Sequence, residues 1–159
     1  MIDDPLVCVV VIFILLLLSA FFSGSETALT AASEGRLHQL SKKGNRSASD
    51  ILVLRERKER LIGAILLGNN LVNILASVLT TGIFLKYFGD AAIAYATLVM
   101  TLLILVFAEV LPKTYAFSHA DRTALAVAPL VKPMVIILAP VTHAIYLFVR
   151  TTLRPLGIE

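Results

Sequence analysis

Apolar residues along this chain gather into three long runs, at residues 6–32, 61–88 and 91–116. A helix rises about 1.5 Å per residue, so each run is long enough to cross a hydrocarbon core about 30 Å thick. Polar residues inside the runs are few and come in short clusters. The pattern therefore predicts three transmembrane helices with these bounds.

The segment between the first two runs, residues 34–60, is strongly polar. Gly44-Asn45 marks a turn, and Ser49-Asp50 is expected to cap a short helix that leads into the second run. We therefore predict two short helices between residues 34 and 60.

The distribution of positive charge predicts the orientation of the chain. Residues 34–60 carry eight basic side chains, whereas the turn at residues 86–90 carries one. Loops rich in lysine and arginine stay in the cytoplasm. We therefore expect residues 34–60 and the C-terminus in the cytoplasm, and the N-terminus and the 86–90 turn outside.

The C-terminal segment, residues 120–155, gives a less direct signal. Its central part, 125–149, is apolar enough to cross a membrane, but three prolines and a lysine interrupt it, and basic residues flank both of its ends. If it crossed, one basic end would lie outside. The pattern favours a kinked belt helix along the cytoplasmic face, with a fourth span as the alternative. The interrupting residues are Pro129, Lys132, Pro133 and Pro140.

Composition agrees with an all-α membrane protein that forms one transmembrane domain over residues 1–159. The chain is 58% hydrophobic and 16% charged, with a mean hydropathy of +0.88, outside the usual range of soluble proteins. The net charge of +3 is concentrated beside the apolar runs. We interpret it as a topology signal and a lipid-headgroup contact, so the expected partner is the bilayer of the cell membrane and not nucleic acid.

The N-terminal run is expected to stay in the mature protein. Asp3 and Asp4 precede it where a signal peptide has basic residues, and no small-residue cleavage site follows a short apolar core. Cys8 is the only cysteine, which excludes an internal disulfide and a thiolate metal cluster.

Three polar clusters interrupt the predicted spans, one in each: residues 23–26, 68–73 and 109–113. Counting from the outer end of each span places all three clusters about 22–29 Å deep, at one level in the inner half of the membrane. An ionisable side chain at that depth is costly, which makes Glu109 a candidate functional residue.

The clusters offer oxygen atoms of several kinds. Asn69 and Asn73 share one helix face. Pro112 has no N–H, which leaves the carbonyl of Ala108 without a helical partner, and Gly24 is expected to permit local unwinding. Carboxylate, amide, hydroxyl and main-chain oxygens suit Mg²⁺, Ca²⁺ or Na⁺, and they do not suit zinc or copper.

Purely structural roles are the alternative for each polar residue. Asparagine and serine often join transmembrane helices by hydrogen bonds, and Glu109 can be protonated against an asparagine. Glu26 is interpreted either as a gate at the cytoplasmic mouth or as a residue in contact with water.

No catalytic activity is expected. A serine nucleophile at position 23 or 25 needs a base at its own depth, and neither a histidine nor a lysine is available there. His38, His119 and His143 are expected at the membrane interface.

Three motifs, FFSGSETALTA, GNNLVNI and AEVLPKTYA, resemble the transmembrane domain of the CorC/CNNM family of magnesium transporters. Members typically have a serine-glycine pair in the first span, G-N-x-L-V-N in the second and G-E-x-L-P in the third. The resemblance covers about residues 6–153. Ala108 replaces the usual glycine, which narrows the expected cavity slightly.

The resemblance implies a homodimer of three-span subunits with an inward-facing Mg²⁺ site, and Mg²⁺ export driven by Na⁺ entry. Carried over by position, the ligands are Ser23, Asn69, Asn73 and Glu109. One carboxylate carries a single negative charge and does not balance a dehydrated divalent ion. Further oxygen atoms or water molecules must therefore complete the coordination shell of Mg²⁺. Gly24, Ser25 and the Ala108 carbonyl are the additional candidates.

Members of that family usually continue into cytoplasmic CBS domains that bind ATP. We therefore expect this chain to be the transmembrane part of a longer protein, with CBS-type regulatory domains as partners. Two alternatives stay open: a Mg²⁺-sensing membrane scaffold that regulates another transporter, and a Na⁺-selective site that Mg²⁺ occupies only weakly.

Overall fold

The computed structural model describes residues 4–156, and helices make up nearly all of this range, with no strand in it. The expected all-α fold is confirmed. The two 3₁₀ helices and the π-helix are labelled η. In chain order the elements are α1 (Pro5–Ala31), α2 (Glu34–Lys42), α3 (Arg46–Glu56), α4 (Lys58–Phe88), η1 (Gly89–Ala91), α5 (Ala92–Leu103), the π-helix η2 (Ile104–Val110), α6 (Leu111–Ser118), α7 (Ala120–Leu153) and η3 (Arg154–Leu156).

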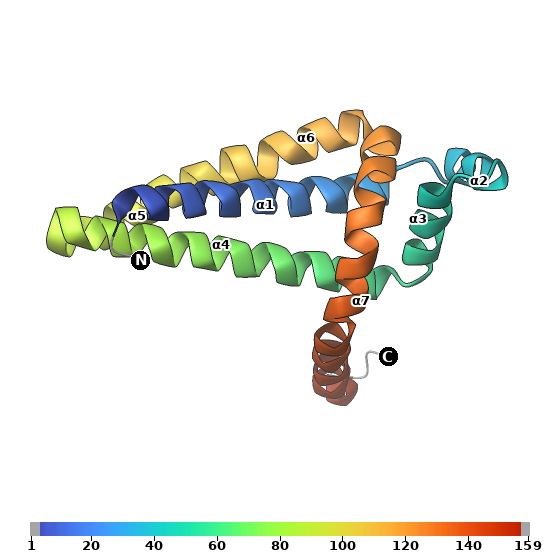
Figure 1. Cartoon of the computed structure of the whole chain (residues 1–159). Coiled ribbons are helices and arrows are strands. Elements are labelled where there is room, and N and C mark those ends of the chain that lie inside the picture. Colours follow the sequence, from blue (N-terminus) through green and yellow to red (C-terminus); the bar gives the residue numbers. More distant parts are fainter. Residues whose placement is uncertain (1–3, 157–159) are drawn as a thin grey trace.

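Three long rods form the bundle (Figure 1). The first two are α1 and α4, and the third is the succession of α5, η2 and α6. α5 packs on α4, whereas η2 and α6 pack on α1. We call the end with η1 the turn end, and the end with α2, α3 and α7 the basic end (Figure 1).

Three helical stretches among the described residues are long and apolar enough to cross a membrane: Pro5–Ala31, Lys58–Ser118 and Ala120–Leu153. The second stretch reverses direction at η1, so it supplies two antiparallel rods. The three predicted spans correspond to the three rods, and each helix boundary lies within a few residues of its expected place.

Local signals explain where the helices begin and end. The Asp4 side chain accepts a hydrogen bond from the Leu6 N–H at 3.0 Å, and Pro5 occupies the first helical position of α1. α4 ends at Phe88, and the residue that caps it, Gly89, has a φ of +57°, in the region that favours glycine.

The predicted cap of the second short helix was wrong. Asn45 caps α3 by accepting the Ala48 N–H at 3.0 Å, and the preceding Gly44 turns the chain with a φ of +86°. Ser49 and Asp50 therefore lie inside α3. Asn45 is the better cap because glycine closes the turn directly before it.

The core lies toward the basic end, where α1, α2, α3, α4 and α7 meet. Small residues allow close approach of the helices, since alanines on α1, α3, α4, α6 and α7 are fully buried. Larger apolar side chains fill the remaining space. The large fully buried apolar residues are Leu29, Leu37, Ile51, Leu61, Ile65 and Val131.

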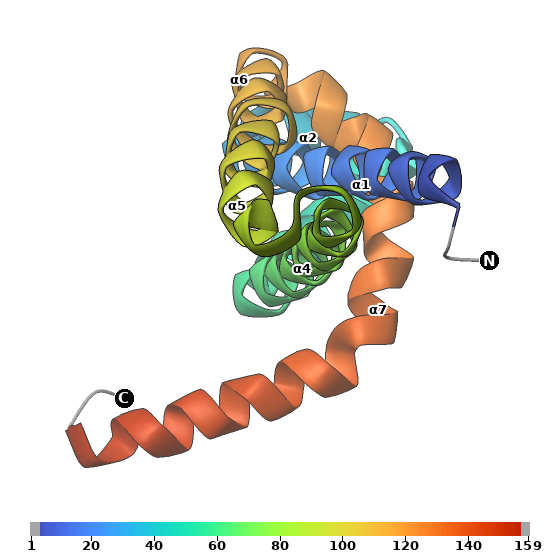
Figure 2. The ribbon, with the colours of Figure 1, turned by 90° about the vertical axis from the view of Figure 1, so that its left-hand side faces the viewer.

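α7 runs crosswise over the basic end of the bundle, in contact with α1, α3 and α4 (Figure 1). Its three prolines do not break it, and the helix bends away from the bundle in its second half (Figure 2). This is the arrangement expected of a belt helix, although Ala120–Leu153 is also long and apolar enough to span. Its placement at the membrane surface stays a prediction.

Polar contacts fix the helices of the basic end to one another. The Arg55 guanidinium donates to the carbonyls of Leu29 and Ala32, each at 2.7 Å, and so satisfies two carbonyls at the end of α1. The Lys132 ammonium of α7 donates to the Asp50 carboxylate of α3 at 2.6 Å.

Candidate cation site

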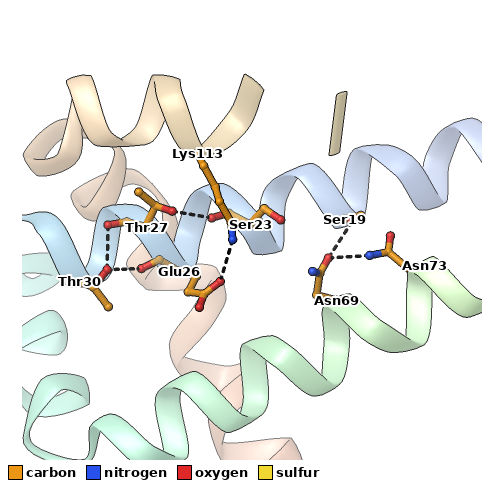
Figure 3. A network of polar contacts seen from close by, with 8 residues as sticks. All are labelled: Ser19, Ser23, Glu26, Thr27, Thr30, Asn69, Asn73 and Lys113. Atoms are coloured by element: carbon orange, nitrogen blue, oxygen red, sulfur yellow. Dashed lines mark hydrogen bonds and ion pairs between the residues drawn. The ribbon is translucent and has the colours of Figure 1, made fainter. Parts of the chain in front are cut away.

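A polar contact joins α1 to the second cluster, on α4 (Figure 3). The Ser19 hydroxyl donates to the Asn69 side-chain oxygen at 2.7 Å, and the Asn73 amide nitrogen donates to the same oxygen at 3.5 Å. Asn70 is exposed, as its position on another helix face predicts. The α1 residue in this contact is Ser19, which lies outside the predicted cluster at residues 23–26.

Ser19 is part of this cluster although the sequence analysis did not select it. The residue is fully buried and bonds directly to Asn69. The available signal was its spacing, because Ser19 lies four residues before Ser23 and so shares its helix face.

Three buried oxygens lack hydrogen-bond partners within the described chain: Ser23 Oγ, Ser25 Oγ and the side-chain oxygen of Asn73. A buried polar atom without a partner costs about 1–3 kcal/mol, so such atoms usually mark a water or a ligand. Two of the three belong to the expected ligand set. Oxygens of these two kinds, hydroxyl and amide, suit a hard cation with its waters.

Ser23 and Asn73 lie on opposite sides of the Ser19–Asn69 contact (Figure 3). α1 and α4 are antiparallel, so four residues along each helix lead in opposite directions and separate the two positions by about 12 Å along the bundle. One Mg²⁺ with bonds of about 2.0–2.1 Å cannot bind both side chains directly in this conformation.

Gly24 and Ser25 face other parts of the bundle. α1 is continuous through Gly24, so the expected unwinding is not observed. Gly24 packs against α6, and a Cβ on it would meet Pro112 Cβ at 3.7 Å, an ordinary van der Waals contact. Ser25 is rotated by about 200° from Ser23 around the helix axis, away from the side that carries Ser19 and Ser23.

The third cluster contains a π-helix where a simple proline break was expected. η2 covers Ile104–Val110, and the Leu111 N–H donates to the Val106 carbonyl, five residues back. Ala108 within it is fully buried. Short π-helices often occur at functional sites. The π-helix ends directly before α6, in which Pro112 occupies the second position. Its wider turn changes the hydrogen-bond register of the backbone ahead of the proline.

Glu109 comes at the expected level of the bundle. Gly24 faces Pro112, and Glu109 precedes Pro112 by three residues, which places it within about one helical turn of the Ser19–Asn69 contact. The side chain is half-buried and lines a groove of about 500 Å³ between α4 and α5. Its carboxylate forms no hydrogen bond or ion pair with any residue from 4 to 156.

Glu26 has a partner that the sequence analysis did not foresee. Its carboxylate lies 3.8 Å from the Lys113 ammonium, which links α1 to α6 on the basic-end side of Ser23 (Figure 3). Lys113 offsets the charge of Glu26, whereas the charge of Glu109 has no such counterpart in the described chain.

Acidic, histidine and cysteine side chains do not gather into a group of three or more anywhere in residues 4–156. The oxygens near Ser19 and Asn69 come mainly from amides and hydroxyls. Oxygens of these kinds would suit a hard cation. The groove that Glu109 lines includes none of the other expected side-chain ligands, Ser23, Asn69 and Asn73.

Comparison with known proteins identifies relatives along almost the whole chain. The family model described as the cyclin M transmembrane N-terminal domain (CNNM) matches residues 10–159. The UPF0053 inner membrane protein YfjD of Escherichia coli (strain K12) is 43% identical over 142 residues, which cover 89% of this chain and 33% of that protein.

Two relatives from Haemophilus influenzae extend the comparison. A UPF0053 protein is 37% identical over 150 residues, covering 94% of this chain and 36% of its own length. A polyamine export protein is 26% identical over 132 residues, covering 75% of this chain and 31% of its own length. The chain thus spans about a third of the length of the curated relatives it matches.

Proposed function

Because the chain belongs to the CorC/CNNM family of multi-pass membrane proteins, we propose that it carries Mg²⁺ across the cell membrane. The single observation that supports this most directly is the unpartnered side-chain oxygen of Asn73, which is buried beside Asn69 in the middle of the bundle. The Glu109 carboxylate at the same level supplies negative charge for a cation.

The proposed ligands remain Ser23, Asn69, Asn73 and Glu109, with the Ala108 carbonyl as an addition. Since Ser23 and Asn73 are too far apart to bind one ion directly, we assign Ser23 to a water of the Mg²⁺ shell. Mg²⁺ gives up its water reluctantly and usually keeps several molecules when protein binds it. A partly hydrated ion therefore suits a site with one carboxylate.

The direction and coupling of transport belong to the same proposal. The basic end faces the cytoplasm, because it carries the eight basic side chains of residues 34–60. Mg²⁺ enters from this side and leaves outward, in exchange for Na⁺, through a homodimer. The cytoplasmic CBS-type domains of a longer protein would regulate this step.

A liposome experiment tests transport directly. The purified chain is reconstituted with a Mg²⁺-sensitive dye inside, and Mg²⁺ and Na⁺ gradients are set independently. We expect Mg²⁺ flux that increases with an opposing Na⁺ gradient and that falls to the level of empty liposomes in Glu109→Ala. Mg²⁺ binding without any flux would instead support the second candidate, a Mg²⁺-sensing scaffold.

A different cargo is the remaining candidate. One relative bears the name polyamine export protein, and the groove beside Glu109 is larger than a bare metal ion requires. Adding spermidine to the liposome assay separates the two. Transport of labelled spermidine with no Mg²⁺ flux would contradict the choice of Mg²⁺.

A further inference from the structure

Two helices end and two begin at one corner of the basic end. α1 and α6 end there, and α2 and α7 begin there (Figure 1). A pocket of about 580 Å³ opens between these four helix ends, and its lining shares no residue with the proposed cation ligands. The polar and charged residues that line it are Ser33, Arg36, Ser118, His119, Asp121 and Arg122.

The depth of this pocket matches the headgroup layer of a bilayer. From Pro5 to Ala31, α1 extends about 39 Å along its axis, or about 37 Å across a bilayer at the usual tilt of about 20°. A hydrocarbon core is about 30 Å thick, and the headgroups extend the bilayer to about 40–45 Å. With Pro5 at one edge of the core, Ala31 therefore reaches the headgroup layer on the other side. The same count from Ala92 places Ser118 at that level.

The pocket carries positive charge that the protein does not neutralise. Arg122 is exposed and forms no hydrogen bond or ion pair within the described part of the chain. The Arg36 guanidinium lies 3.5 Å from the Asp121 carboxylate, which also accepts the Ser33 N–H at 2.7 Å. Arg36 and Asp121 thus offset one another. With histidine neutral, the two arginines and one aspartate leave the pocket with one net positive charge, that of Arg122.

An apolar wall lies beside these charged groups. Phe117, which is 72% exposed, and Leu125 both line the pocket. A phospholipid has the two matching parts, because its phosphate accepts charge-assisted hydrogen bonds from a guanidinium and its acyl chains are apolar. Its phosphate diester also carries a single negative charge, which one unpaired arginine balances. Free phosphate has no apolar part and carries more charge at pH 7.

We propose that this pocket binds the headgroup of an anionic phospholipid, with its phosphate on Arg122 and its acyl chains against Phe117. Basic pockets between transmembrane helices are typical sites for such headgroups. Phosphatidylcholine presents the same phosphate together with a cationic choline, so the pocket attracts it less. The inference goes beyond the proposed function, because it does not depend on the cargo that the protein carries.

A single tryptophan in the pocket can report which lipid lies there. The chain contains no tryptophan, so Phe117→Trp introduces one reporter at an exposed position of the pocket wall. The variant is reconstituted into phosphatidylcholine vesicles, and brominated phosphatidylglycerol or brominated phosphatidylcholine is added as the quencher. The ratio of the two quenching curves gives the relative affinity of the two lipids at this position.

Arg122→Gln in this background is the decisive variant. A basic residue near an anionic headgroup contributes about fivefold to binding, so the reporter chain should prefer phosphatidylglycerol about fivefold over phosphatidylcholine. Arg122→Gln should bind the two lipids equally. Since Arg122 has no partner to lose in the described chain, its replacement should leave the thermal stability unchanged.

Two further variants separate the pocket from the general charge of the basic end. Asp121→Asn frees Arg36 and keeps an oxygen for the Ser33 N–H, so the preference for phosphatidylglycerol should rise to about 25-fold. Lys42→Gln removes a positive charge from α2 outside the pocket and should keep the fivefold preference.

Each result decides the proposal. Equal quenching by the two lipids in the reporter chain, or a preference that persists in Arg122→Gln, would overturn it. Millimolar sodium phosphate should leave the preference unchanged relative to sodium chloride of the same ionic strength. Its loss in phosphate alone would make the pocket a site for free phosphate and overturn the assignment to lipid. Because Mg²⁺ is absent throughout, failure of this proposal is distinguishable from failure of the proposed transport.

Discussion

Ser19 and Asn69 join α1 to α4 through a 2.7 Å hydrogen bond in the middle of the bundle. The same Asn69 oxygen accepts from Asn73, so one amide orients both the helix contact and the neighbouring ligand candidate. This side chain links the stability of the bundle to the geometry of the proposed site.

Ser19→Ala is therefore expected to affect both properties. Loss of one hydrogen bond between transmembrane helices costs about 0.6–2 kcal/mol. Mg²⁺ affinity should also fall several-fold, because Asn69 becomes free to rotate. Thermal unfolding in detergent and calorimetry measure the two effects. Thr142→Val is the control, since its hydroxyl bonds only within α7.

Glu109→Gln removes the charge and keeps the shape of the side chain. We expect the Mg²⁺ affinity to fall at least tenfold, while thermal stability stays equal or rises, because an unpaired carboxylate at membrane depth is costly. Glu26→Gln provides the comparison: it leaves Lys113 without its partner and should change Mg²⁺ affinity less than Glu109→Gln does.

Gly68→Ala tests the packing between α1 and α4. A Cβ at Gly68 would lie 2.8 Å from the ring of Phe22, so the ring must move. Overpacking of this kind costs about 1–3 kcal/mol. The double variant Phe22→Leu, Gly68→Ala should recover most of the lost thermal stability, and no recovery would contradict the contact.

The ion pair between Lys132 and Asp50 attaches α7 to α3. Lys132→Met should increase hydrogen–deuterium exchange in α7 while leaving α5 unchanged. The pair is partly exposed, so a double-mutant cycle with Asp50→Asn is expected to give a coupling of about 1 kcal/mol that falls at high salt. Exchange unaltered in α7 would show that its apolar contacts alone hold it.

Helix positions could be predicted closely because apolar runs and helical rise depend on local sequence alone. The common level of the three clusters followed from the same counting. Gly24 meets Pro112 as that counting expects, but Asn69 bonds to Ser19, four residues before the predicted cluster of α1. The family resemblance found in three short motifs is confirmed by the match over residues 10–159.

Details that depend on pairs of helices could not be predicted. Depth counting assumed that the outer ends of α1 and α4 lie at one level, which placed Ser23 opposite Asn69 and Asn73. In the structure Asn69 lies opposite Ser19, so Ser23 and Asn73 fall on opposite sides of that contact. The partner of Glu26 also required knowledge of how α6 meets α1. The π-helix at Ile104–Val110 has no signal in the apolar pattern, since a single extra residue in one turn leaves that pattern almost unchanged.

The C-terminal end of α1 is stabilised by Arg55, a residue of α3. Because its guanidinium holds the carbonyls of Leu29 and Ala32, the last turn of α1 is completed by a side chain of α3. Any tilt of α3 must either carry that turn along or expose two carbonyls. A displacement of α3 is therefore transmitted to the end of α1, about two helical turns from Ser23.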